Sequence, residues 1–309
     1  MSAPTRIARL PFDQLPAWLT DELAQAGLDA QEVYDAVTRA MAEDLPGDDV
    51  TSWATIPADQ VDTADFVARG DGIVAGLAVG ELVFRYVLGE VEVERAVCDG
   101  TPVHRGDVVL TVTGPTALLL TAERTALNFT CHLSGVATAT RGWVQALSAT
   151  GRTRVRDTRK TIPGLRHLEK YAVRAGGGVN HRTDLSEMAL VKDNHVLAAG
   201  GVVPAWEKVR AAYPDVPVQV EVTTLDQLCE LLAVGADEIL LDNMDDVTMR
   251  EAVEITAGRA RLEASGGLTL GRAAEVAATG VDFISVGALT HSAPVLDIAM
   301  DLRTATDRS

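Results

Sequence analysis

The pattern of hydrophobic and polar residues changes character along the chain. From about residue 15 to residue 45 the apolar positions recur at helical spacing, which predicts two helices separated near Gly27. Residues 91–97 and 108–113 alternate with a period of two, as is typical of strands with one buried face. Turns are expected around these strands, at Asp99-Gly100, Arg105 to Asp107 and Gly114-Pro115. Together these segments predict a small N-terminal α+β domain.

Beyond about Ala126, short and nearly unbroken apolar runs alternate with segments of helical period. This alternation is typical of buried parallel strands joined by helices. The sequences Gly235-Ala-Asp237 and Gly280-Val-Asp282 each close a helix and start a strand, as expected for repeated βα units. A barrel is favoured over a dinucleotide-binding sheet because no glycine fingerprint follows the first strand. The clearest predicted strands are residues 188–191, 218–222, 238–242 and 282–286.

Length and composition fit two domains. The chain has 309 residues, 47% of them hydrophobic, which is enough for one large and one smaller core. Three widely separated cysteines, Cys98, Cys131 and Cys229, are expected to be reduced and buried. No apolar run follows the first arginines and none approaches the ~20 residues of a membrane span, so we expect a soluble, cytoplasmic protein without a membrane segment.

Positive charge is concentrated in one part of an acidic chain. The formal net charge is −17, yet ten of the 27 Lys and Arg residues fall between Gly151 and Lys192, where only four acids occur. Nucleic acid is an unexpected partner, because backbone binding requires positive charge over a broad face and aromatic residues are scarce. The concentrated cations suit a small polyanionic ligand instead.

Several of these cations lie where predicted strands end. In α/β barrels, function collects at the carboxyl ends of the strands. Arg159 and Lys160 precede a Pro-Gly turn, and Lys192 follows the run 188–191. With Arg182 they form a set suited to carboxylate and phosphate oxygens, since Arg offers a planar fork and Lys a point charge. We therefore expect them around one anion-binding mouth.

Two acids terminate successive predicted strands. Glu221 belongs to the run 218–222, and Asp242 ends the run 238–242. Carboxylates facing a cationic mouth can bind ribose hydroxyls, hold a divalent metal or stabilise a cationic transition state. The sequence leaves these three roles open.

Glycine-bearing loops follow the late strands and are candidates for phosphate binding. Backbone N–H groups bind phosphate, and in barrels the loops after the last two strands are its usual site. The two loops contain Ser265, Gly266 and Gly267, and Val286, Gly287 and Ala288. His181 attracts interest only because Arg182 adjoins it, and we interpret the other histidines as structural, namely His104, His132, His167, His195 and His291.

These motifs, in this order, resemble the quinolinate phosphoribosyltransferase family from about Glu43 to Leu302. The resemblance implies an N-terminal α/β sandwich domain, residues 1–127, to which residues 292–309 return. It also implies an open (β/α) barrel of type II phosphoribosyltransferase kind over residues 128–291. The matching segments are residues 43–51, 121–128, 132–138, 157–164, 170–182, 190–195, 240–243, 265–267 and 286–291.

The resemblance implies a role for each candidate residue. Arg124 would reach across a homodimer interface to the pyridine substrate of the partner subunit. Lys160 would be a central catalytic cation, with Glu221 and Asp242 as catalytic acids on the ribose and metal side. The two glycine-bearing loops would hold the 5′-phosphate. The remaining substrate ligands would be Thr158, Arg159, His181, Arg182 and Lys192.

The resemblance further implies transfer of phosphoribosyl from phosphoribosyl pyrophosphate to quinolinate, with loss of CO₂, in the de novo synthesis of NAD. It implies Mg²⁺, no organic cofactor, and a homodimer or dimer-based hexamer whose active sites are shared between subunits. Two alternatives stay open. One is a relative of the same fold that uses another acceptor, as in the molybdenum-associated members, and the other is a non-catalytic anion-binding barrel.

Overall fold

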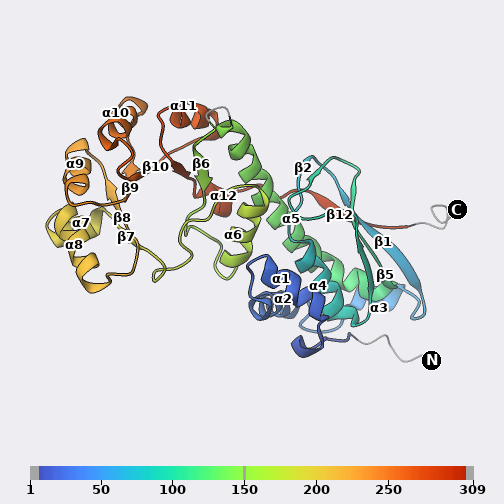
Figure 1. Ribbon diagram of the computed structural model, residues 1–309. Coiled ribbons are helices and arrows are strands. Elements are labelled where there is room, and N and C mark those ends of the chain that lie inside the picture. The colour runs from blue at the N-terminus through green and yellow to red at the C-terminus, as the bar shows by residue number, and fades with distance from the viewer. Residues whose placement is uncertain (1–6, 149–150, 304–309) are drawn as a thin grey trace. The chain divides into compact units, whose positions relative to one another are not determined.

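The computed structural model describes residues 7–148 and 151–303 in two compact units (Figure 1). Within these residues, unit 1 comprises 7–139, 162–176 and 292–303, and unit 2 comprises 140–148, 151–161 and 177–291. The domain boundary predicted between residues 127 and 128 falls inside helix α5 (Thr116–Leu147), which continues through it, and unit 1 extends to Ala139. Residues 1–6, which belong to the predicted N-terminal domain, lie outside the described residues.

Unit 1 contains a four-stranded antiparallel sheet. Its order is β12 (Ile298–Leu302), β1 (Val61–Ala68), β5 (Val108–Pro115), β3 (Glu92–Arg95), so the C-terminal strand lies beside β1. The strands predicted at 91–97 and 108–113 are confirmed. The turn predicted at Gly114-Pro115 was wrong, because both residues continue β5 opposite β1. A proline lacks the ladder N–H but is tolerated at a strand end, and Pro115 is the last residue of β5.

Helices cover this sheet. The two predicted N-terminal helices are α1 (Ala17–Gln25) and α2 (Ala30–Asp44), separated by Gly27 in a left-handed conformation. Helix α4 (Leu77–Leu88) has ten buried residues among its 12 and contacts both α2 and β5, so it forms the centre of the unit 1 core. The other elements of unit 1 are a 3₁₀ turn (Phe12–Gln14), α3 (Val50–Thr55), the short strands β2 (Gly72–Ile73) and β4 (Pro102–Val103), and α6 (Arg166–Ala175).

Unit 2 contains a six-stranded parallel sheet. Its order is β6 (Arg154–Arg156), β11 (Phe283–Ser285), β10 (Arg261–Ser265), β9 (Glu238–Asp242), β8 (Val218–Val222), β7 (Ala189–Val191). The first strand lies beside the last and the others follow in chain order, with β6 and β7 at the two ends. This is the order of an open α/β barrel, as predicted, and the strands predicted at 188–191, 218–222, 238–242 and 282–286 are confirmed.

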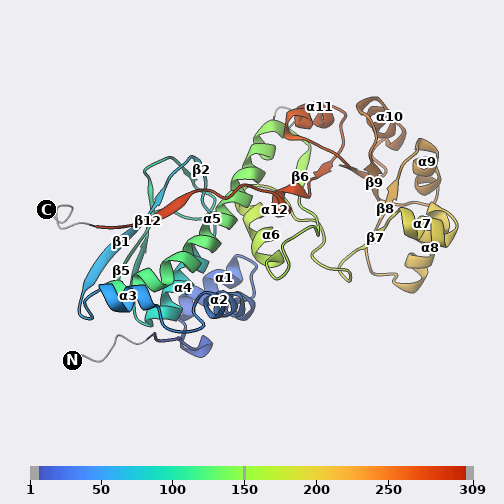
Figure 2. The same ribbon diagram turned by 180° about the vertical axis from the view of Figure 1, so that it is seen from behind.

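Helices of unit 2 lie around the outside of these strands (Figures 1 and 2). Side chains cap the start of α9 (Leu225–Ala233): Thr224 Oγ1 accepts the Gln227 N–H, while Gln227 Oε1 accepts the Thr223 N–H. The other helices are α7 (Asp193–Ala199), α8 (Val202–Ala212), α10 (Asp246–Thr256), a 3₁₀ turn (Leu270–Arg272), α11 (Ala273–Ala277) and α12 (Ala288–His291).

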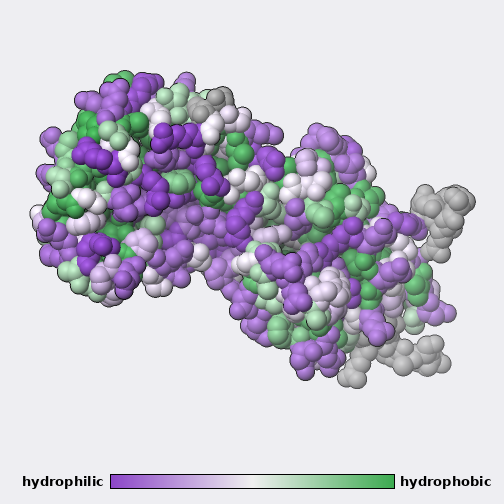
Figure 3. Space-filling view, viewed as in Figure 1, coloured by the Kyte–Doolittle hydropathy of each residue, from purple (hydrophilic) through white to green (hydrophobic). Residues whose placement is uncertain are grey.

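The exposure of the cysteines differs from the expectation. Cys98 and Cys229 are exposed and only Cys131 is partly buried, so the predicted burial was wrong for two of the three cysteines. Cys229 is on the solvent side of α9, whose buried residues are Leu228, Leu231 and Leu232. Hydrophilic and hydrophobic residues intermingle on the face shown in Figure 3. Among the described residues, no helix combines the length and apolar character needed to cross a membrane.

Candidate functional site

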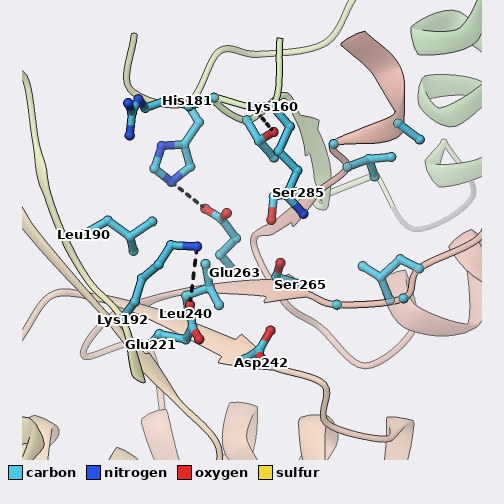
Figure 4. A pocket seen from close by; sticks show the side chains of 18 of the residues that line it. Lys160, His181, Leu190, Lys192, Glu221, Leu240, Asp242, Glu263, Ser265 and Ser285 are labelled. Carbon is cyan, nitrogen blue, oxygen red and sulfur yellow. Dashed lines mark hydrogen bonds and ion pairs between the residues drawn. The ribbon is translucent and has the colours of Figure 1, made fainter. Parts of the chain in front are cut away.

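Unit 2 has a cavity of about 710 Å³ at the carboxyl ends of its strands (Figure 4). All six strands contribute to it, because parallel strands end at the same edge of a sheet. A cavity of this size suits small-molecule and nucleotide ligands. One contributor from the end of each strand, in chain order, is Lys160, Lys192, Glu221, Asp242, Ser265 and Val286.

Every site residue predicted from the sequence, except Arg124, lines this cavity. Arg124 belongs to the part of α5 in unit 1, where its side chain is 64% exposed and 3.9 Å from the Glu123 carboxylate. Seven further residues that were not among the predicted site residues also line the cavity. They are Leu190, Leu240, Asn243, Glu263, Leu268, Ser285 and His291.

The cations of the cavity lie close enough to influence one another. Burial lowers the pKa of the Arg182 guanidinium, and the positive charge of Arg159 lowers it further. Arg182 Nη1 donates to the Met188 carbonyl at 2.8 Å. Within the described residues, Arg159 Nε is buried and has no hydrogen-bond partner. A buried donor without a partner and two mutually repelling cations are both stabilised by an anion.

Two hydrogen bonds fix the backbone of Lys160, and a glycine leaves room for its side chain. Its amide donates to Thr158 Oγ1 at 3.0 Å, and its carbonyl accepts from Thr290 Oγ1 at 2.7 Å. Its side chain passes over Gly287, where a Cβ would come within 2.8 Å of Lys160 Cδ. A glycine at 287 therefore leaves the space that the lysine stem occupies.

His181 is fixed in orientation by its neighbours. Its amide donates to Asp157 Oδ1 at 2.8 Å, and its Nδ1 accepts the Arg182 N–H at 2.7 Å. The ring proton must then reside on Nε2, which donates to Gln219 Oε1 at 2.9 Å. Both ring nitrogens are engaged, so this geometry shows how His181 positions Arg182. Its role as a substrate ligand stays a prediction.

A charged network inside the barrel supports the floor of the cavity. Glu263 is almost completely buried and accepts hydrogen bonds from Arg156 Nη1 at 2.8 Å and Gln219 Nε2 at 3.1 Å. Arg156 lies 3.8 Å from Glu238, which is also paired with Arg261. These side chains come from β6, β8, β9 and β10, so the network connects four strands. Within the described residues, Arg156 Nε, Glu238 Oε2 and Glu263 Oε1 are buried without a hydrogen-bond partner, so the network is satisfied only in part.

The two predicted acids lie on the lower side of the cavity in Figure 4. Burial raises the pKa of the Glu221 carboxyl, the nearby Asp242 carboxylate raises it further, and Lys192 lowers it. Lys192 Nζ lies 4.0 Å from Glu221 Oε2. Asp242 Oδ2 accepts a hydrogen bond from Asn243 Nδ2 at 2.7 Å. Two neighbouring carboxylates therefore face a cluster of cations.

The loop after β10 requires its glycines. Gly266 and Gly267 have φ values of 95° and 59°, in the left-handed region that favours glycine. A Cβ at Gly266 would also overlap the Asn243 side chain. The loop can thus place backbone N–H groups at the cavity, as a phosphate site requires.

Comparison with known proteins gives a consistent result. The model of the quinolinate phosphoribosyl transferase C-terminal domain matches residues 136–301, and that of the N-terminal domain matches residues 49–134. The nicotinate-nucleotide pyrophosphorylase [carboxylating] of Mycobacterium leprae (strain TN) is 50% identical over 274 residues, covering 87% of this chain and 96% of the relative. A probable enzyme of the same name from Bacillus subtilis (strain 168) is 43% identical over 266 residues, covering 86% and 91%.

Solved structures agree with the sequence relatives. NadC from Streptococcus pyogenes has a TM-score of 0.85 at 38% identity, covering 94% of this chain and 98% of that one. The nicotinate-nucleotide pyrophosphorylase from Francisella tularensis has a TM-score of 0.84 at 34% identity, covering 97% and 100%. Sequence, fold and the position of the cavity thus agree, and the chain belongs to the quinolinate phosphoribosyl transferase family.

Proposed function

We infer that this protein transfers the phosphoribosyl group of phosphoribosyl pyrophosphate to the ring nitrogen of quinolinate. Pyrophosphate is released, the 2-carboxylate leaves as CO₂, and the product is nicotinate mononucleotide, a step in NAD synthesis. The names of the relatives support this reaction. The observation that carries it is the cavity at the carboxyl ends of the unit 2 strands, in which several cations face two carboxylates.

The cations match the charges of quinolinate. Arg159, Arg182 and Lys192 bind its two carboxylates, and the buried Arg159 Nε gains the partner that it lacks among the described residues. Nicotinate carries one carboxylate, so it would leave part of this positive charge without a partner. Polar groups left unpaired give strong discrimination, and we therefore expect the site to reject nicotinate.

The acids match the charge that develops on the ribose. When the bond from ribose C1′ to pyrophosphate breaks, positive charge accumulates on the ring, and Glu221 and Asp242 stabilise it. Lys160 offsets negative charge on the leaving pyrophosphate. Attack of the quinolinate nitrogen on C1′ then forms the new bond.

Mg²⁺ fits the donors of this site. It prefers carboxylate, phosphate and water oxygens and usually binds through one or two carboxylates together with substrate phosphates. Among the described residues no group of three or more His, Cys, Asp and Glu side chains could hold a metal alone, so Glu221 and Asp242 would share it with pyrophosphate oxygens. When bound, the ion neutralises charge on the leaving group.

Decarboxylation needs no organic cofactor. After transfer, the ring nitrogen is cationic and adjoins C2. The bond from C2 to its carboxylate breaks, CO₂ leaves, and the electron pair remains at C2 beside the positive nitrogen until a proton from solvent replaces the carboxylate. The protein contributes by orienting the diacid through Arg159 and Arg182.

Arg124 belongs to this proposal through a second subunit. Its side chain is exposed on α5, and it does not line the cavity of unit 2. We assign it to the cavity of a partner subunit, where it binds quinolinate, in a homodimer or a hexamer built from dimers.

Purified protein with both substrates and Mg²⁺ tests the reaction. We expect nicotinate mononucleotide, pyrophosphate and CO₂ in equal amounts, measured by chromatography and by release of labelled CO₂. Lys160→Ala is the control and should abolish all three. Absence of the nucleotide with the unaltered protein contradicts the proposal, and equal turnover of nicotinate favours the alternative of a different acceptor.

A further inference from the structure

Asn243, at the edge of the cavity, has an unusual backbone conformation. It directly follows β9 and has a φ of 53°, in the left-handed region. Among the described residues, only Arg9 and Ala257 share this feature outside glycine. Ala257 ends helix α10, where the conformation is common. Asn243 ends no helix, and since it is exposed, packing of its side chain into a core does not account for it.

The conformation allows Asn243 to make contacts in two directions. Its backbone N–H donates to the Ser265 carbonyl at 3.0 Å, which joins the end of β9 to the end of β10. Its side-chain Nδ2 turns back and donates to Asp242 Oδ2 at 2.7 Å. The Asp242 carboxylate therefore has one oxygen held by Asn243, which limits rotation of the group.

The same side chain also contacts the glycine loop. Asn243 Oδ1 occupies the space that a Cβ at Gly266 would take, and Gly266 is itself left-handed with a φ of 95°. Asn243 thus lies between the Asp242 carboxylate and the Ser265–Gly267 loop and touches both. Any shift of the asparagine would change the position of one relative to the other.

We propose that Asn243 is a positioning residue that holds the Asp242 carboxylate, and with it the Ser265–Gly267 loop, in the arrangement required for phosphoribosyl transfer. The inference rests on the proposed function, because it acts through Asp242. An amide suits this position, since it supplies the donor that Asp242 accepts. An aspartate of the same size would remove that donor and add a third negative charge beside Asp242 and Glu221.

Asn243→Gly isolates the side chain from the backbone, because glycine adopts the left-handed conformation without strain. We expect kcat to fall about 10-fold or more, which is the usual effect of removing a residue that orients a metal-binding side chain. The KM for quinolinate should stay within about twofold, because its carboxylate ligands are unchanged. The melting temperature should be equal or higher, and Asn243→Asp should lose more activity than Asn243→Gly.

Ala257→Gly is the matched control. It relieves the same backbone conformation at the end of α10, at a residue that does not line the cavity, and should keep the wild-type kcat. Wild-type kcat in Asn243→Gly overturns the inference. A loss of kcat with a fall in melting temperature that Ala257→Gly does not show assigns Asn243 a structural role and also overturns it. If wild-type protein does not turn over quinolinate at all, the proposed function itself fails, and this inference with it.

Discussion

Neighbouring charges shift the pKa of Glu221 in opposite directions. Burial and the Asp242 charge raise its pKa, whereas Lys192 lowers it, and the net direction is upward. The folded state therefore binds a proton more readily than the unfolded chain. The contribution of Glu221 to stability falls as pH rises from the ordinary pKa of a glutamate through its raised value. Because the proposed reaction requires the ionised form to stabilise a cationic ribose, activity should be lost on acidification at a higher pH than for an ordinary glutamate.

Substitutions of the two neighbours should move this pKa in opposite directions. Asp242→Asn removes a negative charge and should lower the pKa of Glu221, while Lys192→Ala removes a positive charge and should raise it. Carboxyl ¹³C NMR titration of protein freed of divalent metal measures both changes. Asp193→Asn is the control. It should lower the pKa of Glu221 by less than Asp242→Asn does, because Asp193 has the weakest effect on this pKa, after burial, Asp242 and Lys192. Shifts of the same sign for Asp242→Asn and Lys192→Ala would contradict this account.

At the scale of single residues, the sequence allowed prediction of side chains that lie at the carboxyl ends of strands or just beyond them. Lys160, Lys192, Glu221 and Asp242 were selected in this way, and the structure places all of them around the cavity. Glu263 was missed because it lies in the middle of β10, away from the carboxyl end, where its neighbours Leu262 and Ala264 suggest only burial. Its hydrogen-bond partners, Arg156 and Gln219, come from strands that are distant in the sequence, so no local sequence pattern predicts this network.

Among the elements, α3 depends on a single capping carboxylate. Asp49 accepts from the Ser52 N–H at 3.0 Å and from Thr121 Oγ1 of α5 at 2.9 Å. Burial raises the pKa of Asp49, but the hydrogen bonds from Ser52 and Thr121 outweigh it, and the pKa is lowered. A lowered pKa means that this stabilisation is complete above the unfolded value of about 3.9 and is lost as pH falls through the folded value.

Asp49→Ala should therefore destabilise the protein by about 1 kcal/mol at pH 7, the usual cost of losing a helix cap. The difference from wild type should shrink as the pH is lowered below the ordinary pKa of an aspartate, because the protonated carboxyl is a poorer acceptor. Urea denaturation at several pH values gives both quantities. Asp48→Ala is the control: it removes the adjacent exposed carboxylate and should lower the free energy of unfolding by less than Asp49→Ala does. A destabilisation that is independent of pH would rule out the charged cap as its cause.

Four strands of unit 2, namely β7, β8, β9 and β11, were predictable because each is a short, largely apolar run bounded by glycine or polar residues. Strands β6 and β10 contain charged residues and were not among the predicted strands. The runs 218–222 and 238–242 match β8 and β9 residue for residue. Pairing between distant segments was not predictable from local pattern: only the resemblance suggested that the C-terminal segment, which forms β12, returns beside β1. The continuity of α5 was also missed, since a domain boundary inside a helix leaves no composition signal.

For the whole molecule, the distribution of charge matters more than its total. A net charge of −17 would repel phosphoribosyl pyrophosphate and quinolinate at long range, yet four of the ten cations between residues 151 and 192 line the cavity. Screening by salt reduces the long-range repulsion more than the contacts inside the cavity. Arg124 lies outside this segment and does not line the cavity, and its proposed place in a partner's cavity makes assembly part of the proposed catalysis.

Mixed dimers test whether Arg124 acts in the partner subunit. Arg124→Ala and Lys160→Ala should each be inactive alone, because every site lacks one cation. A dimer of one chain of each kind contains one site with both residues intact and one with neither. Random pairing makes half of the dimers mixed, so co-expression should restore about a quarter of the wild-type specific activity.

The same mixture separates the two possible geometries. If Arg124 served the cavity of its own chain, both sites of a mixed dimer would lack one cation, and no activity would return. Arg105→Ala, which alters another exposed arginine of unit 1, is the control for loss of charge and should stay active alone. Size-exclusion chromatography with light scattering must show dimers or larger assemblies in every sample. Restored activity in the mixture, with two inactive parents, would require that each complete site takes Lys160 from one chain and Arg124 from the other.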